Sequence, residues 1–126
     1  MLYPFPPTRG ASSPWGSIQS VTPLGPDAVA VTTASHGGLR ISLTAMTRLP
    51  KRLQRTAFSE GGWFEEDCDW AIPYLALGLD AHEADPDRGA RLRNAARRTI
   101  WTYHRDHAAL LGVTEDPAQA EGRSDG

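Results

Sequence analysis

Two short stretches in the first third of the chain alternate apolar with polar or small residues. Ser17–Thr22 has the two-residue period of a half-buried strand, and Ala28–Thr33 follows as a second strand. The Leu24-Gly25-Pro26-Asp27 segment between them has the composition of a turn, so the pair predicts a β-hairpin. Leu39–Ile41 adds a short third strand. A sheet of this size is stable only when another element covers its apolar face.

Helices predicted further along the chain supply that cover. Ser42 is expected to cap a short helix over Leu43–Leu49, which ends near a proline. Asp85-Pro86 joins an N-cap to the residue favoured at the first helical position, and the longest helix is expected from there to about His104. Residues at three- and four-residue spacing define its apolar face: Leu92, Ala95, Ala96, Thr99, Ile100 and Tyr103.

Between these two helices, the sequence predicts another that starts near Phe64 or Glu65 and runs to Leu77, with Gly78 as its C-terminal stop. Acidic residues in its first turn would complement the positive end of the helix dipole. Pro73 lacks the N–H of an interior helical residue, so a continuous helix must kink there. The predicted fold class is therefore α+β, a small antiparallel sheet of about three strands packed against three or so helices.

Length and charge limit the organisation and the partners. The chain has 126 residues, which is enough for one domain; we expect an extended arm over 1–14, a single α+β domain over 15–113 and a disordered tail over 114–126. A net charge of −2 makes nucleic acid and anionic membranes unlikely partners. No apolar run approaches the roughly 20 residues of a membrane span. One cysteine excludes an internal disulfide, so a cytoplasmic location is the simplest expectation.

The densest polar cluster is Gly61–Trp70, which holds four carboxylates and the cysteine within ten residues. A second cluster, Ser35–Gly38, places a histidine before a glycine pair, which permits unusual backbone conformations and close approach. The histidine there suits a general base or a metal ligand. The acids disfavour a Cys68 thiolate, although a helix N-terminus would favour one. The candidate catalytic residues are His36, Glu65, Glu66 and Cys68, and the candidate binding residues are Ser35, His36, Gly37, Gly38, Glu65, Glu66, Asp67 and Asp69.

Each of these patterns also has a structural explanation: a helix start, a turn histidine or a small buried cysteine. A metal held by His36, Cys68 and one carboxylate is conceivable, but the sequence lacks the two short ligand pairs of familiar zinc sites. His104 and His107 lie three apart on the last helix without an evident third ligand, which is typical of a solvated helix end. We therefore expect no stoichiometric metal and no cofactor.

Three blocks in the same order, Pro14–Gly16, Ser35–Gly38 and Gly61–Ala71, resemble a small uncharacterised family of proteins found in bacteriophages, plasmids and integrated mobile elements. Members sometimes lie beside, or are fused to, antirestriction proteins. The resemblance covers about residues 14 to 77, and the third block is its most specific part. It implies an intracellular accessory role and groups the polar residues as one site: His36, Glu65, Glu66, Asp67 and Cys68. Pro73 departs from the family pattern, where an aliphatic residue is more typical.

Two functions of different class follow. The first is a non-enzymatic protein-binding module that modulates a host or competing-element factor through the histidine turn and the acidic segment. The second is a small hydrolase or metal-dependent enzyme that uses His36 with Glu65 or Glu66. In either case the two polar clusters should lie side by side, because both flank apolar elements that must pack together.

Overall fold

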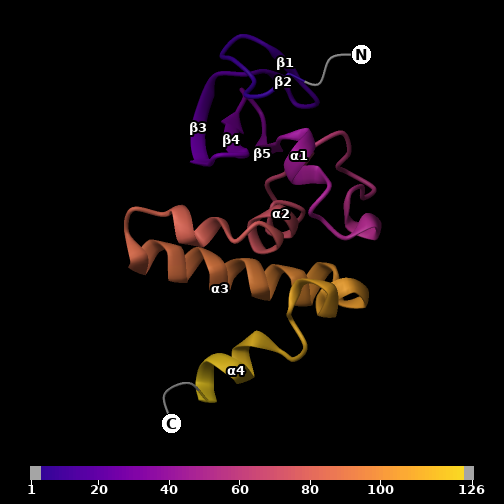
Figure 1. The fold of residues 1–126 in the computed structure, drawn as a ribbon, viewed down its shortest axis with the longest axis vertical. Helices are drawn as coiled ribbons and strands as arrows, with labels where there is room; N and C mark the ends of the chain where they lie inside the picture. Colours follow the sequence, from indigo (N-terminus) through magenta and orange to yellow (C-terminus); the bar gives the residue numbers. More distant parts are fainter. Residues whose placement is uncertain (1–3, 124–126) are drawn as a thin grey trace.

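The computed structural model describes residues 4–123 and confirms an α+β fold (Figure 1). The sheet lies at one end of the molecule, α2 lies below it, and α3 crosses the molecule between α2 and α4. The strands are β1 Ser12–Ser13, β2 Gly16–Ser17, β3 Ser20–Gly25, β4 Ala28–Thr32, β5 Gly37–Ile41 and β6 Trp63–Glu65. The α-helices are α1 Leu43–Met46, α2 Ala71–Ala76, α3 Pro86–Tyr103 and α4 Pro117–Arg123, and the 3-10 helices are η1 Lys51–Leu53, η2 Leu79–His82 and η3 Arg105–Leu111.

The main sheet is antiparallel with strand order β3-β4-β5-β6. The predicted hairpin is present as β3 and β4, although β3 begins three residues later than expected, at Ser20. The third strand, β5, is also present, and it begins at Gly37, so the glycine pair lies in the strand and not in the turn. A fourth strand, β6, pairs with β5 through Leu39 opposite Phe64, and the prediction of about three strands missed it.

The prediction that Phe64 or Glu65 begins a helix is wrong, because this segment is β6 and the helix α2 begins only at Ala71. Gly61 and Gly62 have φ of 64° and 87°, which reverses the chain into the strand. The side chains then alternate: Phe64 is fully buried against the helices, and Trp63 faces the opposite side of the sheet. No acidic residue stands in the first turn of α2, so the dipole argument does not apply.

The kink at Pro73, expected only for a helix that ran continuously from about Phe64, does not arise because α2 begins at Ala71. Pro73 is the third residue of α2 and lies within the first turn, where the N–H groups have no partner inside the helix. Gly78 does end the helical segment as predicted, with a left-handed φ of 61°.

Both faces of the sheet are covered. Ala28, Leu39 and Ile41 belong to the main core with the helices, whereas Val29 and Val31 pack with Ile18 on the other face. Partly buried aromatic residues complete this second cluster: Phe5, Trp15 and Trp63. The N-terminal segment, predicted as an extended arm over 1–14, is therefore a cover for the sheet in the residues that the structure describes; residues 1–3 lie outside them.

The helical caps follow the sequence closely. The Ser42 hydroxyl accepts the Ala45 N–H at 3.0 Å, and the Asp85 carboxylate accepts the Asp87 N–H at 2.9 Å. On α3, Ala96 and Ile100 are fully buried as expected, but Tyr103 is 64% exposed, because the chain turns away at the next residue.

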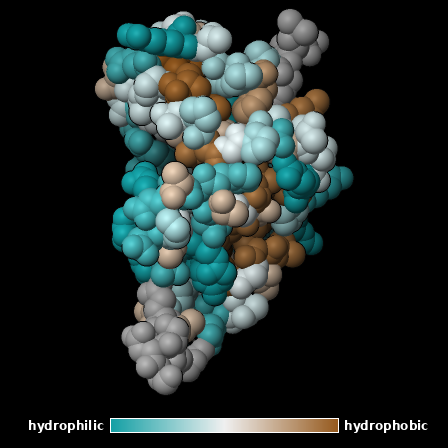
Figure 2. All heavy atoms as spheres, turned by 60° about the vertical axis from the view of Figure 1, so that its left-hand side comes forward, coloured by the Kyte–Doolittle hydropathy of each residue, from teal (hydrophilic) through white to brown (hydrophobic). Residues whose placement is uncertain are grey.

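The C-terminal segment is not a disordered tail over the residues described. Val113 and Pro117 are buried, and α4 packs against α3. Residues 124–126 lie outside the description. Across the view of Figure 2, hydrophobic atoms reach the surface in separate spots among hydrophilic ones. Within residues 4–123, no helix combines the length and the apolar character that crossing a membrane needs.

Candidate functional site

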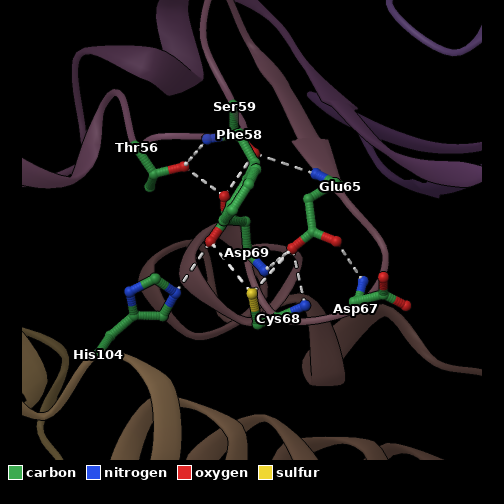
Figure 3. A network of polar contacts seen from close by, with 8 residues as sticks. All are labelled: Thr56, Phe58, Ser59, Glu65, Asp67, Cys68, Asp69 and His104. Atoms are coloured by element: carbon green, nitrogen blue, oxygen red, sulfur yellow. Dashed lines mark hydrogen bonds and ion pairs between the residues drawn. The ribbon is translucent and has the colours of Figure 1, made fainter.

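The segment between β6 and α2 is a tight turn held by one carboxylate (Figure 3). The Asp67 N–H donates to Glu65 Oε2 at 2.6 Å, and the N–H groups of Cys68 and Asp69 donate to Oε1 at 2.8 and 2.6 Å. The Trp70 N–H donates to the Glu65 carbonyl at 2.9 Å. The Glu65 side chain thus supplies the acceptors that this turn would otherwise lack, which is a structural role.

These contacts set the protonation of Glu65 and Cys68. Burial by itself would raise the pKa of Glu65, but the donors from Asp69, Cys68 and Asp67 together hold that pKa below its usual value. The Cys68 thiol donates to Glu65 Oε1 at 3.1 Å. Burial, followed by that hydrogen bond and the nearby carboxylates, raises the pKa of Cys68 to about 12. The thiol is therefore protonated near neutral pH and is no nucleophile in this environment.

Asp69 points inward and is only 1% exposed, so it is not the surface binding residue that the sequence predicted. Its Oδ2 accepts the hydroxyl of Ser59 at 2.6 Å and also that of Thr56. Its Oδ1 lies 2.9 Å from His104 Nε2, which belongs to the residue that follows α3. Burial by itself would raise the pKa of Asp69, but His104, Ser59 and Thr56 outweigh it and lower that pKa.

The structure does bring the two polar clusters side by side, as predicted. Gly38 is paired with Glu65 in the β5–β6 ladder, and the antiparallel register therefore sets the turn before β5 beside the turn after β6. His36 Nδ1 lies 4.0 Å from Glu66 Oε1. Thr33 fixes the histidine turn, because its hydroxyl donates to the His36 carbonyl at 2.7 Å and accepts the His36 N–H at 3.1 Å.

The glycine pair permits close approach and not an unusual φ. A Cβ on Gly38 would lie 2.2 Å from the Phe64 carbonyl oxygen and 2.5 Å from the Trp15 ring. A Cβ on Gly37 would lie 3.1 Å from a Glu66 carboxylate oxygen and 2.7 Å from a backbone carbonyl. Glycine at both positions lets the indole and the carboxylate lie directly over the strand.

Two cavities adjoin these residues. The first, of about 300 Å³, is lined by Trp15, His36, Gly37, Phe58, Glu65, Glu66, Asp67 and Cys68. The second, of about 380 Å³, is lined by Arg52, Leu53, Arg55, Thr56, Ala57, Phe58, Cys68, Asp69, Tyr103, His104 and His107. Phe58 and Cys68 line both cavities.

The predicted site residues thus divide into three groups. His36, Gly37, Glu66 and Asp67 line the first cavity with Glu65 and Cys68. Ser35 is exposed on the histidine turn but does not line that cavity, and Gly38 is buried below it. Asp69 belongs to the buried network that faces the second cavity.

Sequence reasoning missed Phe58, Ser59 and His104 as site residues. His104 was interpreted as a solvated helix end, but its side chain is 15% exposed and reaches Asp69 from 35 positions further along the chain. Its position in the sequence, directly after the last apolar turn of α3, did not indicate that its side chain would contact Asp69. Phe58 is 73% exposed, and an aromatic ring among small polar residues was the signal available for it.

Trp15 belongs to the first of the three sequence blocks, yet no role was assigned to it. Its ring packs edge-on against Trp63, with centroids 5.7 Å apart, and forms one wall of the first cavity. All three blocks therefore meet at this cavity, through Trp15, His36 and the turn after β6.

Comparison with known proteins identifies a family for this chain but does not indicate an activity. A search of curated proteins gave no match. A search of solved structures gave none either. The model of one family, described as "Domain of unknown function (DUF7007)", matches residues 8–125, and the chain belongs to that family.

Proposed function

We propose that this chain is a non-catalytic protein-binding module whose first cavity receives a cationic side chain of a partner protein. The observation that carries the proposal is the lining of that cavity, which combines carboxylates with aromatic rings. Such a lining is complementary to the guanidinium of arginine more than to any neutral or anionic group.

The charge of the lining supports a cation. Three carboxylates, from Glu65, Glu66 and Asp67, face one imidazole, from His36. The Glu66 side chain is 50% exposed, and Asp67 is exposed as well, so both carboxylates are open to a partner. The Glu65 carboxylate accepts backbone N–H groups of its own turn, so it adds negative charge to the cavity but is not available for a direct hydrogen bond to the ligand.

The aromatic walls support a planar cation. Trp15 and Phe58 both line the cavity, and Phe58 is 73% exposed, which is uncommon for a large apolar side chain without a partner. A guanidinium above an aromatic face gains roughly 0.5–2 kcal/mol, and an adjacent carboxylate adds directional hydrogen bonds.

The alternative, a hydrolase that uses His36 with Glu65 or Glu66, has one observation in its favour, the 4.0 Å separation of His36 Nδ1 and Glu66 Oε1. Glu65 does not suit this role, because its carboxylate already accepts three backbone N–H groups. Cys68 does not suit it either, because its thiol stays protonated. Binding therefore accounts for more of the lining than catalysis does.

The biological setting is part of the same proposal. The resemblance of the three sequence blocks to proteins of bacteriophages and plasmids supports an accessory role on a mobile element, inside the cytoplasm. An acidic cavity is suited to a host or competing-element factor with an exposed basic segment, such as a nucleic-acid-binding protein.

The ligand class is tested by amide NMR titration with N-acetyl-arginine methylamide, using the neutral citrulline analogue as the matched ligand. We expect shifts at His36, Gly37 and the Trp15 indole with the arginine compound alone. Glu66→Gln combined with Asp67→Asn should abolish them, whereas Glu60→Gln, an exposed acid outside this cavity, should not. Equal shifts with the citrulline compound would refute recognition of a cation.

The partner is sought by affinity capture from the native host with mass spectrometry. A protein that binds stoichiometrically to the parent chain, and not to the Glu66→Gln/Asp67→Asn variant, supports the module. Turnover of a substrate that needs both His36 and Glu66 would favour the hydrolase instead.

A further inference from the structure

A second group of side chains, which shares Cys68 with the lining of the first cavity, has the composition of a metal site. Cys68, Asp69 and His104 each offer one ligand atom, and these atoms all lie within 4.8 Å of one another. We propose that Cys68, Asp69 and His104 bind one zinc ion, which joins the turn after β6 to the end of α3. This site is independent of the cation-binding function proposed above.

The spacing of the three atoms suits tetrahedral zinc. Bonds of roughly 2.0–2.3 Å at tetrahedral angles place neighbouring ligand atoms about 3.3–3.6 Å apart. Cys68 Sγ lies 3.7 Å from Asp69 Oδ1, and His104 Nε2 lies 2.9 Å from the same oxygen. Rotation of the cysteine and histidine side chains, with exchange of the Glu65 hydrogen bond for the metal and release of the thiol proton to solvent, would therefore complete three zinc bonds.

His104 provides a second, independent observation. Its Nε2 is buried and, among the atoms described, has no hydrogen-bond partner, even though Asp69 Oδ1 is 2.9 Å away. The two atoms are close enough to interact electrostatically, but the ring N–H is not aligned with the oxygen as a good hydrogen bond requires. Two ligands of one metal ion have this geometry, because each lone pair is directed at the ion and not at the other ligand.

The surroundings of Asp69 resemble an outer ligand shell. Ser59 and Thr56 donate hydroxyl hydrogens to Oδ2, which fixes the carboxylate and leaves Oδ1 for a metal (Figure 3). The side chain is 1% exposed, so an ion bound there would compensate a charge that is otherwise expensive to bury.

The second cavity leaves room for a fourth ligand. His107 lines it beside His104, and Arg52 and Arg55 line it as well. The fourth position of the zinc would then be filled by water or by an anion that the two arginines favour. Zinc is the ion expected, because thiolate and imidazole together select it over magnesium or calcium.

The proposal departs from the sequence analysis, which weighed His36, Cys68 and one carboxylate as ligands and expected no stoichiometric metal. Cys68 is grouped with Asp69 and His104 and not with His36, which lines the first cavity. The matched control is therefore built into the molecule: His36→Ala and His104→Gln each remove one imidazole from a cavity that Cys68 lines.

The probe is Co²⁺ added to chelator-treated full chain, followed by Zn²⁺ in competition. We expect a thiolate-to-cobalt charge-transfer absorption that saturates at about one equivalent and that Zn²⁺ displaces. Cys68→Ser should abolish the absorption, His104→Gln should weaken affinity at least about 10-fold, and His36→Ala should leave it unchanged.

Because His104→Gln also removes a buried partner of Asp69, circular dichroism must show that the variant is folded. Thr56→Val provides a second variant, with an expected loss of about 10–100-fold in affinity through the outer shell. X-ray absorption of the zinc-loaded parent should find one sulfur per zinc. Absence of the charge-transfer absorption in the folded parent, or its loss in His36→Ala, would overturn the proposal.

Discussion

Adjacent acids in this chain have different roles. Glu65 accepts three backbone N–H groups and holds the turn after β6, whereas Glu66 is half-exposed beside His36. The sequence analysis treated both acids as candidate site residues. The hydrogen bonds give Glu65 a structural role and leave Glu66 available to a partner.

Glu65→Gln should therefore destabilise the chain by about 1–3 kcal/mol, because an amide offers one acceptor oxygen and places N–H donors against the backbone donors of the turn. Glu66→Gln should change the free energy of unfolding by less than about 0.5 kcal/mol. Urea denaturation of both variants measures the difference. Equal stability of the two variants would remove the structural role assigned to Glu65.

Asp69 should be the most sensitive acid of the molecule. Asp69→Asn removes a buried charge that interacts with His104 and two hydroxyl groups, and loss of one partner from such a pair typically costs about 3–5 kcal/mol. Asp67→Asn, two positions earlier in the same turn and exposed, is the control and should cost almost nothing. Thermal melting with a chelator present separates this effect from metal binding.

Among the elements, the pairing of β5 with β6 places the site. It sets the histidine turn beside the acidic turn, and it depends on the absence of a side chain at Gly38. The sequence analysis assigned the glycine pair to a turn. In the structure, the absence of a side chain at Gly38 allows the Trp15 ring and the β6 backbone to lie close to β5.

Gly38→Ala should weaken this pairing, because the new methyl group would lie 2.2 Å from the Phe64 carbonyl oxygen and 2.5 Å from the Trp15 ring. Overpacking of this kind costs about 1–3 kcal/mol. Gly25→Ala in β3 is the matched control, since its nearest neighbour is the exposed His82 ring at 3.0 Å. Amide exchange in β6 and the melting temperature should both distinguish the two variants, and similar behaviour would contradict the close-approach argument.

For the whole molecule, the hydrogen-bonded carboxylates of Glu65 and Asp69 make the free energy of unfolding depend on pH. The folded pKa values of Glu65 and Asp69 lie below the ordinary values of 4.5 and 3.8. Above those ordinary values both groups are ionised in the folded and unfolded chain, and their stabilisation is fully present. As the pH falls, the unfolded chain takes up protons first, so stability is lost until the lowered folded pKa values are passed.

We therefore expect the free energy of unfolding to decrease steadily below about pH 4.5. Urea denaturation at a series of acid pH values, in the presence of a chelator, measures this slope. Glu65→Gln should show a shallower slope than the parent, and an identical slope would mean that Glu65 is not linked to folding.

Local signals in the sequence were sufficient for the fold class, the β3–β4 hairpin, the cap of α3 at Asp85 and the stop at Gly78. Each depends on residues within a few positions of one another, where backbone preference and capping dominate. The second cover of the sheet was also encoded, because Ala28–Thr32 is apolar on both faces, but the sequence analysis assumed a sheet with one apolar face.

Only the tertiary structure determined the conformation of the acidic segment. The charges of Phe64–Asp69 suit the start of a helix. In the structure, however, Phe64 pairs with β5 in the sheet, and the Glu65 carboxylate accepts the backbone N–H groups of the turn that follows. The contact between His104 and Asp69 also depends on tertiary structure, because the packing of α3 against α2 brings together residues 35 positions apart. Contacts of that range leave no periodic trace in the sequence, because they are set by which elements pack together and not by local preference.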